Sequence, residues 1–160
     1  MKSISFLVLF FSPTIFLFPQ NTDLNNQNFL KKNSVNIEFG GYTVLGAVYY
    51  ERVIVNQPKF KAVGQIGYGL IGWPIGLMGL FSSNKHHFEI GACITFPSNL
   101  IVEYDYSSYL TGRLGYRFQK PEGNFVFRAG LMPVVVGPDK ELGPDMILWV
   151  WPGISFGMAF

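Results

Sequence analysis

Residues suited to acyl transfer or hydrolysis gather in one short stretch of the chain. Ser82 and Ser83 could supply a nucleophile, His86 and His87 a general base, and Glu89 the acid that orients the base. The topology inferred below places most of them at a turn, on no shared wall. Two adjacent histidines in a turn are usually only polar, so we expect no catalytic site and no enzymatic activity.

The residue types give little support for a metal site, a disulfide or nucleic-acid binding. Cys93 is the only cysteine, so no intramolecular disulfide can form, and no Cys/His spacing typical of a metal site is present. A small buried filler is the simplest role for it. The net charge is +2, and the only basic run is the pair Lys31 and Lys32. We therefore expect no cofactor and no nucleic-acid partner.

The composition is unusual for a water-soluble domain. Only 14% of the 160 residues are charged, against about 25% in an average soluble domain, whereas 17% are aromatic. Beyond the N-terminus, however, no apolar run approaches the length of roughly 18 residues that a membrane-spanning helix needs. A transmembrane β-barrel resolves this conflict, because its apolar residues are dispersed at every second position.

The N-terminus is typical of an export signal. Lys2 is followed by an apolar run over residues 4–18, so residues 1–20 are predicted to be a signal peptide cleaved near Gln20. The alternative is a short membrane anchor, because small residues are missing before the expected cut. Residues 21–33 are polar and rich in asparagine, which predicts a disordered lead-in. Residues 34–160 then form a single barrel domain.

Alternation with a period of two carries the fold prediction. In YLTGRLGYRFQ, residues 109–119, Leu110 and Leu114 fall on one face and Arg113 and Arg117 on the other. Similar alternation predicts an all-β, eight-stranded antiparallel up-and-down barrel, although the fourth segment alternates poorly. The predicted strands are residues 34–41, 43–54, 58–70, 73–81, 86–96, 109–119, 124–134 and 149–160.

The connections between these strands indicate an orientation. If the chain begins in the periplasm, the short turns VNQP, SSNK and KPEG are periplasmic, and the longer segments 97–108 and 135–148 are extracellular. The outer segments are acidic. Aromatic residues sort into two belts, as expected at the two interfaces of a bilayer. The periplasmic belt would comprise Phe60, Phe81, Phe88, Phe118, Phe125 and Phe160, and the outer belt Tyr68, Trp73, Phe96, Tyr109, Trp149 and Trp151.

The polar face of the strands is predicted to be the inner one. It carries mostly Gly, Thr and Gln with one or two charges per strand, which is too sparse to solvate a whole exterior. Eight strands leave an interior just wide enough for side chains. Positive and negative side chains are nearly equal in number on this face. This favours a plugged barrel over an open channel, because a buried charge needs a partner. The expected interior charge network is Glu38, Glu51, Lys61, Glu89, Arg113, Arg117 and Arg128.

Several tracts of the mature chain carry a family resemblance. They are NIEFGG, VYYER, HHFEIGACITF, GRLGYRFQ, GNFVFRAGLMP and GISFGMAF. Together they resemble the small outer-membrane β-barrel proteins of Gram-negative bacteria, in a form like those of Bacteroidetes. The resemblance implies an outer-membrane location, and contact with outer-membrane lipid and the barrel-assembly machinery. It also implies that Phe156, Met158 and Phe160 form a C-terminal assembly signal.

Neither the residues nor the resemblance names a reaction. A non-enzymatic, monomeric outer-membrane barrel with a structural or surface-interaction role is the favoured hypothesis. A soluble lipocalin-like lipid-binding barrel would alternate in the same way but would bury its apolar face. A lipid A-modifying barrel enzyme and a small porin-like pore are the remaining alternatives.

Overall fold

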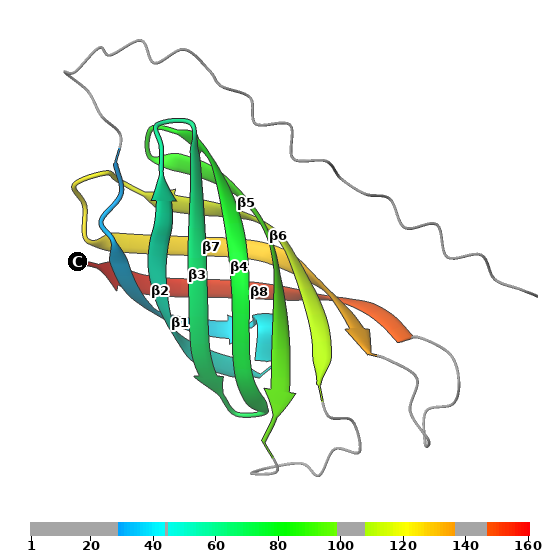
Figure 1. Ribbon diagram of the computed structural model, residues 1–160. Coiled ribbons are helices and arrows are strands. Elements are labelled where there is room, and N and C mark those ends of the chain that lie inside the picture. The colour runs from blue at the N-terminus through cyan, green and yellow to red at the C-terminus, as the bar shows by residue number, and fades with distance from the viewer. Residues whose placement is uncertain (1–28, 44, 99–107, 137–146) are drawn as a thin grey trace, which may run out of the picture.

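The described strands form a closed antiparallel barrel (Figure 1). The computed structural model describes residues 29–43, 45–98, 108–136 and 147–160. In these residues each strand pairs with its sequence neighbours, and the first pairs with the last, as predicted. The strands are β1 (Asn33–Gly40), β2 (Gly46–Asn56), β3 (Phe60–Gly69), β4 (Gly72–Ser83), β5 (His86–Pro97), β6 (Tyr109–Gln119), β7 (Phe125–Val136) and β8 (Ile147–Ala159).

The predicted eight-stranded antiparallel barrel is therefore confirmed for the described chain. The proposed signal peptide and most of the two longer connections lie outside the described residues. In the part of the chain that is described, no helix is long and apolar enough to cross a membrane.

The two ends of the barrel differ in their connections. The turns β2–β3, β4–β5 and β6–β7 meet at one end, together with the start of β1 and the C-terminus, and we call this the turn end (Figure 1). The opposite end, which we call the loop end, carries the β1–β2 and β3–β4 links, the ends of β5 and β7 and the starts of β6 and β8. Each strand runs from one end to the other, so a residue's position along its strand fixes its height in the wall.

The largest boundary difference lies between β1 and β2. The second strand was predicted over 43–54, but β2 begins at Gly46 and ends at Asn56. Gly40 and Gly41 adopt positive φ angles of 70° and 76°, which turn the chain out of the strand. The short 3-10 helix η1 (Gly41–Thr43) follows, and all three of its residues are buried. η1 therefore folds into the barrel.

Two smaller differences have local causes. β4 spans more than the predicted 73–81, and its weak alternation arises because Met78 and Leu80 face the interior with polar residues of other strands. Part of the predicted disordered lead-in is held in place. Leu30 is buried and exchanges two hydrogen bonds with the Asn56 side chain. The backbone of Lys32 accepts a further bond from Val53.

Candidate functional site: the charged interior

Three glutamates and three arginines meet inside the barrel. Glu38, Glu51 and Glu89 come from β1, β2 and β5, whereas Arg113 and Arg117 come from β6. Arg128 on β7 completes the group, and none of the six side chains is more than 1% exposed. Alternation aims them all inward, because each shares its strand parity with other buried residues. We call these six residues the ion network.

Glu89 is the centre of the ion network. Its carboxylate lies 2.8 Å from Arg113 Nε, 3.5 Å from Arg117 Nη1 and 2.9 Å from Arg128 Nε. It therefore touches every arginine of the network. Pairing of this kind is required in the interior, since an isolated buried charge costs several kcal/mol.

The other two carboxylates tie the arginines to the opposite part of the wall. Glu51 lies 2.8 Å from Arg117 Nη1, pairs with Arg128 Nη1, and accepts a hydrogen bond from Ser34 Oγ. Glu38 lies 2.5 Å from Arg113 Nη1. The network thus cross-links β1 and β2 to β5, β6 and β7 through the lumen, which rigidifies and fills it.

Lys61 and His87, both buried, lie nearer the turn end. The Lys61 ammonium donates to the backbone carbonyls of Gln57 and Pro58, at 3.1 and 3.5 Å. His87 Nε2 lies 3.1 Å from the carbonyl of Gln119. Lys61 thus sits in the interior with the rest of the expected set, held by the backbone of its own turn.

The loop end of the lumen is filled by η1, which the sequence reasoning missed. Tyr42 is fully buried, its ring lies 5.6 Å from the Arg113 guanidinium carbon, and its backbone N–H donates to Glu38. Burial raises the pKa of the Tyr42 phenol, while the positive charge of Arg113 acts to lower it. Tyr42 packs edge-to-face on Tyr49, at 6.0 Å between ring centroids.

Glycines on the inner face make room for η1, which we call the plug, and for the Tyr49 ring on which it packs. A Cβ added to Gly67 would lie 2.5 Å from the Tyr49 ring, and one on Gly69 would lie 2.6 Å from the Thr43 side chain. Both contacts are shorter than real Cβ atoms show, so neither position tolerates a side chain without a shift. The adjacent pair Gly40 and Gly41 was the only sequence signal for a tight turn here, and it does not specify the direction of the turn.

The structure divides His86, His87 and Glu89 of the candidate acyl-transfer group between the two faces of the wall. His86 points outward, where its Nδ1 lies 2.6 Å from Tyr116 Oη, whereas His87 points inward. Glu89 is engaged by the arginines of the ion network. Ser82 and Ser83 pair in the β4–β5 ladder with His87 and His86.

The described residues also contain no cluster of three or more His, Cys, Asp or Glu side chains that could hold a metal ion. Cys93 is buried among Tyr42, Ala47, Tyr49 and Met132.

The outer wall is apolar. Phe156, Met158 and Phe160 alternate along β8 and its end, and all three are exposed on the outside. One member of the expected outer belt, Tyr109, faces inward, because it lies on the same face of β6 as the buried Thr111. Its hydroxyl donates a hydrogen bond to the Tyr42 carbonyl. The middle of the wall consists of exposed aliphatic residues, including Ile66, Ile75, Leu77, Ile90, Ile94, Leu110, Leu114, Leu131 and Ile154.

No protein-family model matches the chain, and neither a curated protein nor a solved structure matches it.

Proposed function

We propose that the protein is an integral outer-membrane β-barrel with a closed, charged interior and a structural or surface-interaction role. The observation that carries the proposal is the inverted distribution of polarity. Fully buried glutamates and arginines fill the centre, while large aliphatic and aromatic side chains cover the outside. A barrel folded in water would bury the apolar set, whereas lipid favours it on the exterior.

The height of the apolar wall fits a bilayer. Three consecutive strands carry aromatic residues eight positions apart, at Phe60 and Tyr68, Trp73 and Phe81, and Phe88 and Phe96. Eight steps of about 3.3 Å on strands tilted by roughly 40° separate the two rows by about 20 Å. The rings extend this band toward the ~25 Å height of the apolar surface of outer-membrane barrels.

Neighbouring strands align these rows. Phe60 pairs directly with Phe81, Phe81 with Phe88, and Phe88 with Tyr116. At the loop end Trp73 pairs with Phe96, and its ring lies 4.6 Å from that of Tyr68. Continuous rows at two heights support the assignment of both interfaces, because amphipathic rings favour the headgroup level.

The filled lumen supports a structural or surface role over conduction. The ion network crosses the centre, and η1 occupies the loop end. The separation of His86 from His87 and Glu89 supports a non-enzymatic role. We expect the double variant His86→Ala with His87→Ala to leave lipid A in the host unchanged. Loss of an acyl chain would instead favour the enzyme.

Fractionation of a Gram-negative host tests the proposal. The full chain is expected in the outer membrane, and its gel mobility should differ between unheated and boiled samples, since a closed barrel resists detergent until it is heated. Recovery as a soluble periplasmic monomer would contradict the proposal and favour the lipocalin-like alternative.

A further inference from the structure

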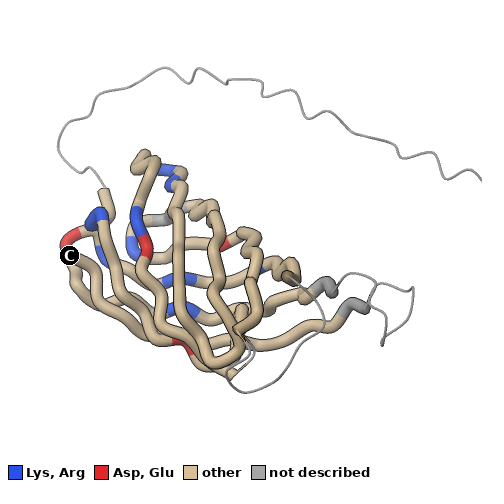
Figure 2. Tube along the Cα trace, turned by 60° about the horizontal axis from the view of Figure 1, so that its bottom comes forward, with Lys and Arg blue, Asp and Glu red and all other residues tan. Residues whose placement is uncertain are grey.

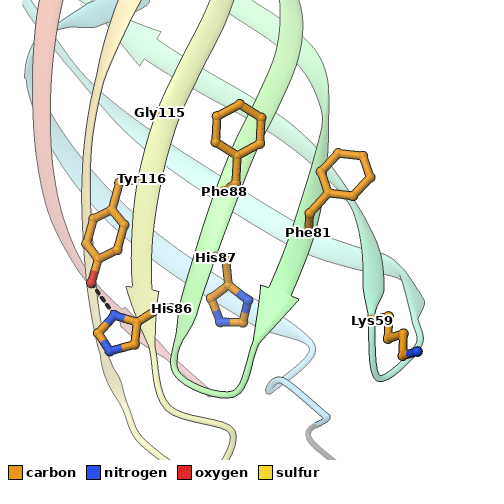
Figure 3. Close-up of a pocket in the computed structure, with 7 residues that line it drawn as sticks. All are labelled: Lys59, Phe81, His86, His87, Phe88, Gly115 and Tyr116. Atoms are coloured by element: carbon orange, nitrogen blue, oxygen red, sulfur yellow. Dashed lines mark hydrogen bonds between the residues drawn. The ribbon is translucent and has the colours of Figure 1, made fainter.

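An open pocket on the outer wall at the turn end is not explained by a purely structural role. It has a volume of about 490 Å³ and lies where the β2–β3 turn meets β4, β5 and β6 (Figure 3). It is lined by Lys59, Phe81, His86, His87, Phe88, Gly115 and Tyr116. We call it the rim pocket.

The floor of the rim pocket is aromatic. Phe81 and Phe88 pair across β4 and β5, with 6.4 Å between ring centroids, and both rings are about half exposed. Beside the pocket, Phe60 extends this aromatic surface, with its ring centroid 5.5 Å from that of Phe81. Such a shelf offers apolar contact to the glycerol and upper acyl region of a lipid, while remaining open to polar groups at the strand ends.

The edge of the rim pocket supplies hydrogen-bond donors. His86 Nδ1 and Tyr116 Oη share one hydrogen bond of 2.6 Å (Figure 3). If Tyr116 donates it, the Nε2–H of His86 remains free to donate, and if His86 donates it, the Tyr116 O–H remains. At least one donor is therefore left over in either tautomer. Lys59, exposed on the adjacent turn, adds a full positive charge.

The surrounding surface is basic. Within the described residues, the segments outside the strands at the turn end carry five lysines and a single acidic residue, Glu122 (Figure 2). The lysines are Lys31, Lys32, Lys59, Lys85 and Lys120. Clustered cations next to a membrane surface attract anionic headgroups, at about 1 kcal/mol for each Lys or Arg.

We propose that the rim pocket binds an anionic glycerophospholipid of the surrounding leaflet. The inference rests on the proposed membrane location. The lipid phosphate meets Lys59, and a glycerol or ester oxygen accepts a hydrogen bond from the spare donor of the pair His86 and Tyr116, which lies on the other side of Phe81 and Phe88 (Figure 3). The glycerol and first acyl carbons lie on Phe81 and Phe88.

Native mass spectrometry of the detergent-purified full chain tests this. The chain is titrated with phosphatidylglycerol or with phosphatidylcholine carrying the same acyl chains, and the apparent Kd of the first bound lipid is measured. The wild type is expected to bind phosphatidylglycerol at least fivefold more tightly, because a single lysine at the headgroup contributes about that factor. Lys59→Gln should lower that preference about fivefold. Lys120→Gln removes the same charge from a turn residue outside the pocket, so it should retain the preference.

The aromatic floor is tested separately. Phe81→Ala combined with Phe88→Ala should weaken the binding of both lipids, and heat-dependent gel mobility shows that each variant is folded. Equal affinity of the wild type for the two lipids, an equal loss in Lys120→Gln, or unchanged binding by the double variant would overturn the inference while leaving the barrel in the membrane. A chain that stays soluble without detergent would overturn the proposed function itself.

Discussion

Replacing Glu89 by Gln removes one negative charge from the centre of the ion network while preserving the shape of the side chain. Glu89 touches Arg113, Arg117 and Arg128, so the variant leaves three buried guanidinium groups facing two carboxylates. Breaking a buried pair in this way typically costs about 3–5 kcal/mol. We expect the free energy of unfolding to fall by that amount.

Glu38→Gln is the matched control, because it makes the same chemical change at the edge of the network. Glu38 contacts a single arginine, Arg113, which keeps Glu89 as a partner. The loss should be smaller, about 1–3 kcal/mol for a buried donor left without its acceptor. Adding Arg128→Met to Glu89→Gln leaves two arginines facing two glutamates in the ion network. This double variant should recover part of the stability lost in Glu89→Gln, since neutral replacements of buried ion pairs are well tolerated.

The assay is urea unfolding of the full chain folded into lipid vesicles, followed by tryptophan fluorescence. The reasoning is refuted if Glu89→Gln costs no more than Glu38→Gln. It is equally refuted if the double variant is less stable than Glu89→Gln alone, because charge balance would then not govern the interior.

Three further outcomes follow from the wall and the plug. Leu77→Arg should lower the free energy of unfolding of the vesicle-embedded barrel by about 2–4 kcal/mol relative to Leu77→Met, because it places a charge at the middle of the bilayer. An unchanged urea midpoint would argue against lipid contact. Gly67→Ala should cost about 1–3 kcal/mol in the same assay, because its Cβ meets Tyr49. Gly79→Ala, on the outer face, should cost less, and the reverse order would contradict the plug. Deleting Phe160 should lower the membrane-integrated yield far more than Asp139→Ala combined with Glu141→Ala in the acidic segment 135–148, and equal yields would mean that assembly does not depend on this terminus.

The strands and their faces were accessible from the sequence because alternation is a local property. Leu114 and Arg113 fall on opposite faces in any register, so the inner and outer rows of β6 need no knowledge of the partners. The pairing inside the lumen is different. Glu38 meets Arg113 across 75 positions of sequence, and Glu51 meets Arg128 across 77. These partners depend on the register of every intervening strand and on barrel closure, which no local pattern encodes.

The plug was missed for a related reason. The residues between β1 and β2 look like an ordinary tight link, and Tyr42 alone carries no sign of where it points. Its inward position requires two positive φ angles at Gly40 and Gly41, together with space left by glycines on distant strands such as Gly67 and Gly153. Only the pair of adjacent glycines was visible in the sequence, and it does not specify a direction.

Lipid exposure of the outer wall is the central claim, and spin-label accessibility measures it most directly. In a Cys93→Ala background, a nitroxide is attached at Leu77→Cys or Ile90→Cys on the aliphatic band, or at Lys85→Cys on a turn, in chains folded into vesicles. The account predicts that the two wall positions collide with dissolved oxygen and are shielded from a water-soluble nickel chelate, whereas position 85 shows the reverse. Nickel accessibility at both wall positions, equal to that at position 85, would contradict it.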